Sequence, residues 1–164
     1  MNKEKILRIL SDHPKWEQKD KLPFGQETKV GDRSQIANQI FPPDLEGASV
    51  LDIGCAEGFF CFEAKRRNAG RVVGIDIDKE RLGEAIKLSR ALSADIEFLE
   101  CDISNVEELG TFDYVLCLDV LHLVEDPIHF IYKLIHLTGR KLILEIADLR
   151  LRRRKRVIVC GRLY

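Results

Sequence analysis

A short apolar run followed by two glycines places the strongest constraint on how this chain can fold. The run covers residues 48–53 and contains β-branched side chains, which is typical of a buried strand. Gly54 and Gly58 then flank a tight turn, and residues 59–67 carry apolar side chains at helical spacing. Glycine lets the backbone take positive φ and lets a ligand come close, and a helix N-terminus offers unpaired N–H groups. The stretch therefore predicts a strand, a turn and a helix that can bind a nucleotide-like or carboxylate-bearing ligand.

Strands and helices alternate along the rest of the chain. Helices are predicted by helical spacing and by start signals such as Asp78 and the pair Asp126–Pro127. The alternation indicates an α/β fold, with a Rossmann-like, doubly wound, mostly parallel sheet of order 3-2-1-4-5. We expect this domain over residues 45–164, preceded by a helical and irregular extension over residues 1–44. In that extension, apolar spacing predicts a helix over residues 3–11, Trp16 can anchor the segment or form part of a substrate lid, and Asp32 can cap a helix that runs to Phe41. Residues 104–107 fit a capping box for a short helix. The later predicted strands cover residues 71–76, 96–101, 113–118 and 141–146.

Candidate binding residues follow four of the predicted strands. In such a sheet, ligands bind outside the carboxyl ends of the strands. These ends hold Gly54, Asp76, Asp102 and the pair Leu118–Asp119. Asp76 lies 18 residues after Gly58, close to the spacing at which an acid meets ribose hydroxyls in nucleotide-binding units. The sequence therefore predicts one binding site at this edge of the sheet.

These motifs resemble those of the class I S-adenosylmethionine-dependent methyltransferases, over roughly residues 45 to 147. The turn preceded by Asp52 is similar to the family's first motif, although Ala56 stands where many members have a glycine. The resemblance implies a methyltransferase with S-adenosyl-L-methionine as cofactor. It also implies where each part of the cofactor binds: the methionine part at Asp52, Gly54, Cys55, Ala56, Gly58 and Phe59, closed by Leu118 and Asp119; the ribose at Asp76; and the adenine at Ile77, Asp102 and Ile103.

Methyl transfer is an in-line displacement that depends on proximity and alignment, so no fixed nucleophile is expected. An oxygen or nitrogen acceptor can need a base, and His122 lies in the loop after the predicted strand that ends at Leu118. A structural role for His122 remains the alternative. His129 and His136 are seven residues apart on one predicted helix, and we interpret both as solvent-edge residues rather than as a metal site.

Parts of the chain also resemble a narrower branch, the tRNA wobble-uridine 5-oxyacetic-acid methyl- and carboxymethyl-transferases. The resemblance lies in residues 14–16, 22–23 and 32–34 and in the motif over residues 52–60. The loop over residues 121–125 lacks the arginine with which that branch binds a carboxylated cofactor. This difference argues against a carboxylated cofactor, and the acceptor stays open between RNA and a small molecule.

Two other functions remain open at this point. A nicotinamide-dependent oxidoreductase would use the same sheet, but the spacing between Gly54 and Gly58 departs from the Gly-x-Gly-x-x-Gly fingerprint. A non-catalytic accessory or truncated methyltransferase-like module is suggested by the few residues after the fifth predicted strand. We predict that residues 157–160 pair antiparallel with that strand, with the basic cluster 152–156 in a solvent-exposed connection. A large substrate, a partner subunit or a second copy is then expected to complete the acceptor side.

Composition narrows the classes further. The chain has 164 residues, 45% of them apolar, and a net charge of −1, which suits one globular domain without a strong field for nucleic acid or membranes. It has no apolar run of membrane-spanning length, and its first residues lack the apolar core of a signal peptide. Its five cysteines form no CxxC pair, so we expect free thiols in a cytoplasmic protein and no metal.

Overall fold

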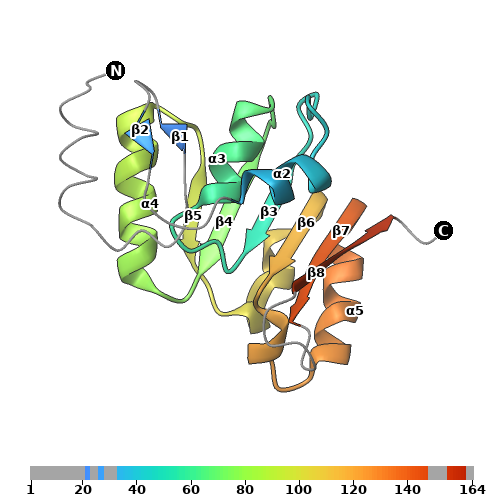
Figure 1. Ribbon diagram of the computed structural model, residues 1–164. Helices are drawn as coiled ribbons and strands as arrows, with labels where there is room; N and C mark the ends of the chain where they lie inside the picture. The colour runs from blue at the N-terminus through green and yellow to red at the C-terminus, as the bar shows by residue number, and fades with distance from the viewer. Residues whose placement is uncertain (1–20, 23–25, 28–32, 148–154, 162–164) are drawn as a thin grey trace.

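The computed structural model describes residues 21–22, 26–27, 33–147 and 155–161, and a mixed sheet forms its centre (Figure 1). The strand order is β5-β4-β3-β6-β7-β8. The pairs β5–β4, β4–β3, β3–β6 and β6–β7 are parallel, which gives the predicted order 3-2-1-4-5 and confirms the fold class. A separate antiparallel pair joins β1 and β2. The strand bounds are β1 Lys21–Leu22, β2 Gln26–Glu27, β3 Val50–Ile53, β4 Val72–Asp76, β5 Glu97–Glu100, β6 Phe112–Leu118, β7 Thr138–Ala147 and β8 Lys155–Gly161.

Strand β8 pairs antiparallel with β7, as the apolar residues 157–160 predicted. Val157 lies opposite Glu145, and Cys160 lies opposite Leu142. The prediction for the basic cluster was wrong in part, because residues 155 and 156 belong to the strand rather than to the connection. A strand that continues pairing with β7 satisfies more backbone groups than an early turn would. The remaining residues of the cluster, 152–154, lie outside the described residues.

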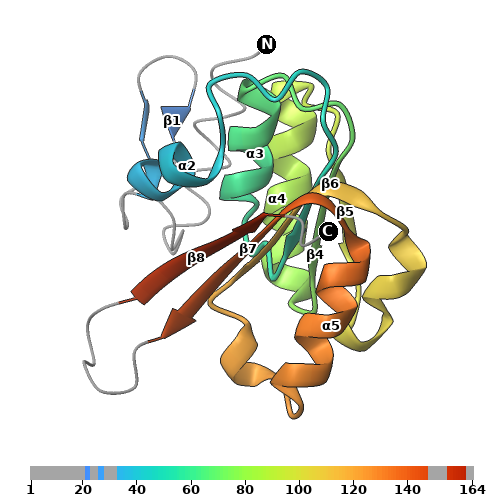
Figure 2. The same ribbon diagram turned by 90° about the vertical axis from the view of Figure 1, so that its right-hand side faces the viewer.

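Helices cover both faces of the sheet (Figures 1 and 2). Side chains of α2 and α3 pack on one face, with α4 beside α3, and α5 and the 3₁₀ helix η1 pack on the other. Asp78 caps α4 and Asp126 caps α5, as predicted, because each side chain accepts a hydrogen bond from the first turn. The helix bounds are α2 Ser34–Ile40, α3 Phe59–Arg66, α4 Lys79–Leu92, η1 Ile103–Leu109, η2 Leu121–Leu123 and α5 Pro127–Leu137.

Two local predictions change in the structure. The segment after Asp102 was predicted to start with a capping box at Ser104, but Asp102 itself is the N-cap of η1. Its carboxylate accepts from the Ser104 N–H, so the N-cap lies two positions earlier than expected. The helix expected to begin after Asp32 starts at Ser34 with Arg33 in the N-cap position. The expected helix over residues 3–11 and the anchor at Trp16 lie outside the described residues.

The sheet interior is apolar on both faces, as strands buried between two helical layers require. All four residues of β3 are buried. Val50 packs toward α2 and α3, and Leu51 packs toward α5, so successive side chains alternate between the two cores. Among the helices in the described part of the chain, none combines the length and the apolar character needed to cross a lipid bilayer.

Candidate functional site

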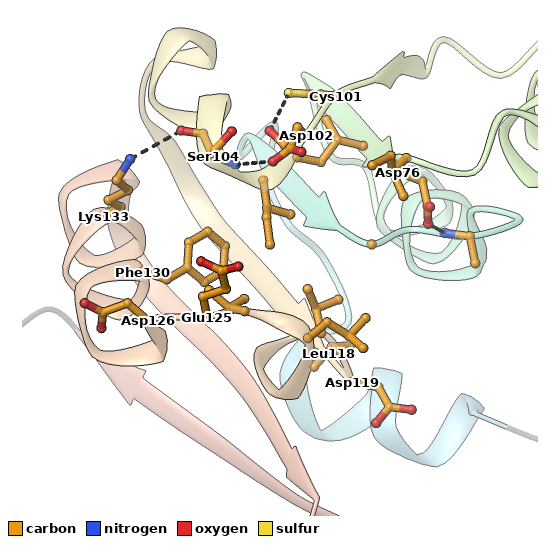
Figure 3. Close-up of a pocket in the computed structure, with 18 of the residues that line it drawn as sticks. Asp76, Cys101, Asp102, Ser104, Leu118, Asp119, Glu125, Asp126, Phe130 and Lys133 are labelled. Atoms are coloured by element: carbon orange, nitrogen blue, oxygen red, sulfur yellow. Dashed lines mark hydrogen bonds between the residues drawn. The ribbon is translucent and has the colours of Figure 1, made fainter.

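A cavity of about 700 Å³ opens beside the carboxyl ends of β3, β4 and β6 (Figure 3). This volume lies in the usual range for small-molecule sites. Eight of the thirteen residues singled out from the sequence line it, which are Gly54, Ala56, Asp76, Ile77, Asp102, Ile103, Leu118 and Asp119. Sequence reasoning thus located the edge of the sheet and the strands that build the site.

Four other predicted residues lie behind the cavity rather than in its wall. Asp52, Cys55 and Phe59 are buried, and none of them lines the cavity. Gly58 is also absent from the wall, and its φ of +85° together with the nearby Phe98 ring leaves no room for a side chain. A Cβ there would lie 2.7 Å from Phe98 Cζ. These residues shape the turn from within the core.

The glycine turn is held in a left-handed conformation at three positions. Gly54, Ala56 and Gly58 have φ values of +70°, +52° and +85°. A Cβ at Gly54 would collide with Val120, so the close packing of the turn needs glycine there. Alanine rarely adopts positive φ, so Ala56 holds a strained conformation in this turn.

Asp76 fixes the turn from the end of β4. Its Oδ2 accepts from the Ala56 N–H at 2.8 Å, and its Oδ1 accepts from the Asp78 N–H at 2.9 Å. Each carboxylate oxygen has a second lone pair. The side chain therefore can hold the strained Ala56 and still accept hydrogen bonds from a ligand in the cavity.

Asp102 lies after the end of β5, the strand next to β4, and forms part of the cavity wall immediately before η1. Its Oδ1 accepts from the Ser104 N–H at 2.8 Å, and this bond holds the pKa of the exposed carboxyl below its usual value. Figure 3 shows the contact and its continuation, in which Lys133 Nζ donates to the Ser104 carbonyl oxygen at 3.3 Å. A carboxylate that stays ionised at this wall can accept hydrogen bonds from a ligand amino group.

His122 does not line the cavity. Its imidazole is half exposed, and Nδ1 lies 4.0 Å from Asp119 Oδ1. The 3₁₀ helix η2 gives the reason, because residues three apart share one side of such a helix. Val120 and Leu123 are three apart and both line the cavity, which leaves His122 on another side.

One face of α5 forms a wall that the sequence reading missed. The positions are spaced three and four apart and so lie on one side of the helix. His129, which we interpreted as a solvent-edge residue, is exposed but belongs to this wall. The helical spacing of polar and aromatic residues was the available signal. The residues of this wall are the N-cap Asp126 and, within α5, His129, Phe130 and Lys133.

Two arginines that also line the cavity were not predicted from the sequence. Arg81 of α4 donates to both carboxylate oxygens of the buried Glu57, at 3.0 and 3.3 Å. Arg33 pairs with the buried Glu145 of β7, and its guanidinium carbon lies 4.9 Å from the centre of the Phe60 ring. Neither pair has a local sequence signal, because each joins elements that are distant along the chain.

Burial changes the chemistry of Asp52 beneath the turn. Burial raises the pKa of this carboxyl to about 7, against the opposing effects of the Cys61 thiol, 3.5 Å away, and the Arg33 charge. The pKa of the Cys61 thiol is raised in turn, mainly by burial. These groups are neutral core residues in mildly acidic solution, and neither is activated as a nucleophile.

Comparisons with known proteins agree with this geometry. Two curated relatives are a ubiquinone biosynthesis O-methyltransferase of Neisseria meningitidis serogroup C (strain 053442) and a tRNA U34 carboxymethyltransferase of Alteromonas mediterranea. The first is 41% identical over 91 residues, which are 51% of this chain and 37% of the relative. The second is 32% identical over 96 residues, which are 55% of this chain and 29% of the relative. The chain thus spans about a third of the length of these relatives.

A solved structure and a family match complete the comparison. The N-terminal domain of EvdMO1, solved with SAH bound, superposes with a TM-score of 0.71 at 18% identity, over 89% of this chain and 66% of that one. This likeness shows the fold. Residues 44–158 match the family described as "Methyltransferase domain", which is well over half of the chain. The chain therefore belongs to the methyltransferase domain family.

Proposed function

We propose that this chain is an S-adenosylmethionine-dependent methyltransferase and that the cavity binds this cofactor. The observation that carries the proposal is the convergence of the glycine turn, Asp76 and Asp102 on one cavity. A ligand that offers a vicinal diol to one carboxylate and an amino group to another matches these acceptors. Membership of the methyltransferase domain family supports the same cofactor.

The nucleoside part of the cofactor is assigned to the walls formed by β4, η1 and α5. Asp76 accepts hydrogen bonds from the ribose hydroxyls, and Asp102 accepts from the adenine amino group, since charged acceptors bind such donors well. Ile77 lines the cavity with its side chain 70% exposed, so it has an apolar surface free to cover one face of the adenine. The Ile103 backbone lies beside Asp102 at the same wall.

The amino-acid part is assigned to the glycine turn, Asp119 and Arg33. The Arg33 side chain is only 19% exposed and lines the cavity. A guanidinium has five N–H donors, and among the described residues only Glu145 accepts a hydrogen bond from it. The spare donors suit the carboxylate of the cofactor, because guanidinium and carboxylate groups match in shape and charge. Asp119, at φ +63°, lies at the end of β6 beside Leu118 and is assigned to the ammonium group.

When bound, the cofactor supplies an electrophilic methyl group. The residues of this chain bind it, orient the sulfonium toward the open side and limit water around it. We keep His122 as the candidate base for an oxygen or nitrogen acceptor, with Asp119 as the neighbour that orients its imidazole. The two side chains are 4.0 Å apart, and this contact can shorten to a hydrogen bond when the substrate binds.

We leave the acceptor as RNA or a small molecule, since one curated relative is named for each class. The acceptor side is proposed to be completed by a large substrate or by a partner subunit, which can be a second copy. Exposed apolar side chains support this proposal: Leu123, which lines the cavity, is 71% exposed, and Ile128, in the first turn of α5, is 69% exposed. We place the reaction in the cytoplasm, where the free cysteines of the described residues would stay reduced.

A cofactor-binding module without catalysis is the second candidate. The observation that favours it is the absence of His122 from the cavity wall. Transfer of labelled methyl groups from S-adenosylmethionine to small RNAs and to metabolite extracts from a deletion strain decides between the two. Labelling by wild type that Asp76→Ala abolishes supports the enzyme. Cofactor binding without labelling of either fraction supports the module.

A further inference from the structure

The wall that carries Asp102 is formed by a short helix with one fully buried side chain. Helix η1 is a 3₁₀ helix of seven residues, and 3₁₀ hydrogen bonds are poorer than those of an α-helix. Val106 is the one residue of η1 that is buried. Ile103 and Leu109, at the two ends of η1, are only partly buried against the same core, so contacts from other elements add to what holds the first turn in place.

Lys133 supplies one such contact from the opposite wall. It lies on α5, and its side chain is 21% exposed. The ammonium group donates to the Ser104 carbonyl oxygen at 3.3 Å and pairs with Glu107 Oε2 at 3.0 Å. One side chain therefore contacts both the backbone and a carboxylate of η1. Figure 3 shows Lys133 reaching across from α5 to Ser104, with Asp102 on the far side of that residue.

The contact is connected to Asp102 through a single residue. Ser104 accepts from Lys133 with its carbonyl oxygen and donates to Asp102 Oδ1 with its N–H. A shift of Ser104 would rotate the carboxylate that it holds. Phe130 and Lys133 of α5 both line the cavity, so the contact from Lys133 to Ser104 links the α5 wall to the wall that carries Asp102.

We infer that Lys133 is a positioning residue for recognition of the purine base. Lys133 holds Ser104 in position. The Ser104 N–H in turn orients the Asp102 carboxylate toward the exocyclic amino group of the adenine. The inference rests on the proposed function, and it goes further by assigning base selectivity to a residue of α5. Lys133 acts through Asp102 and not through the ribose or the amino-acid end.

The test compares two ligands that differ only at the base. S-Adenosylhomocysteine carries an amino group at the purine 6 position, and S-inosylhomocysteine carries an oxygen there, which the Asp102 carboxylate repels. Affinities of both are measured by calorimetry for wild type, Lys133→Met and Glu107→Gln. Lys79→Met is the matched control, since Lys79 pairs with Glu100 at 3.1 Å on the exposed surface and does not line the cavity.

We expect Lys133→Met to weaken S-adenosylhomocysteine about 10-fold, which corresponds to about 1.4 kcal/mol. The affinity for S-inosylhomocysteine should change less than about 2-fold, so the preference of the protein for the adenine base should fall. Glu107→Gln should reduce the preference for the adenine base by a smaller factor, and this variant provides the test if Lys133→Met does not fold. Lys79→Met should leave the preference unchanged.

Equal weakening of both ligands by Lys133→Met would show a general structural role and overturn the inference. Unchanged affinity for both ligands would overturn it as well. A wild type that binds neither ligand would instead remove the proposed function. The two failures are therefore distinguishable in one experiment.

Discussion

Replacement of Asp52 by asparagine should change how stability depends on pH. Asp52 is 2% exposed, and burial raises its pKa from 3.8 to about 7. Between these two values the native state binds a proton that the unfolded state has lost. The free energy of unfolding of wild type therefore falls as pH rises from about 4 to about 7. At about 1.4 kcal/mol per pH unit, this group alone removes about 4 kcal/mol over that window.

Asparagine keeps the shape of the side chain but does not titrate. Wild type and Asp52→Asn should have similar stability near pH 4.5, where Asp52 is neutral in the native state. The variant should become the more stable protein as pH rises toward 7.5. Urea unfolding followed by circular dichroism at four pH values between these limits measures the difference. Parallel curves for the two proteins would refute the reasoning, because they would show that Asp52 has an ordinary pKa in the folded state.

Asp113→Asn should show the opposite pH dependence, because hydrogen bonds from Ser49 lower the pKa of this carboxyl. The substitution should lower the free energy of unfolding by about 1 kcal/mol at neutral pH, and this difference from wild type should disappear as pH falls below 4. A difference that stays the same at every pH in urea unfolding would contradict this prediction. Gly54→Ala should lower the melting temperature and the cofactor affinity together, since its Cβ would strike Val120, and an unchanged thermal melt would argue against this packing. Asp76→Ala should weaken S-adenosylhomocysteine by about 1.5–3 kcal/mol for each charged hydrogen bond lost, and His122→Ala should weaken it less in the same calorimetric titration; equal affinities for Asp76→Ala and wild type would disprove the ribose assignment.

The sheet and its binding edge could be predicted because the signals are local. Asp76 is the last residue of β4 and Asp102 follows β5, so their positions depend only on where each strand ends. The carboxyl ends of parallel strands share one edge of a sheet. Alternation of strands and helices then fixed the strand order, and caps such as Asp78 fixed where helices begin.

The rest of the site depends on how helices are rotated and packed. Lys133 lines the cavity because of the face that α5 presents, and Arg33 does so because β7 places Glu145 beside it. Neither relation follows from spacing along the chain. His122 was placed in the right loop, but the three-residue period of η2 turned Leu123 toward the cavity instead.

Calorimetric titration with S-adenosylhomocysteine, with NAD as the control ligand, measures whether the cavity binds the proposed cofactor. We expect one S-adenosylhomocysteine to bind per chain with a dissociation constant in the micromolar range, and NAD not to bind. Asp76→Ala should abolish most of the signal while the variant remains folded by circular dichroism. Absence of S-adenosylhomocysteine binding to the folded wild type, or binding of NAD in its place, would contradict the account.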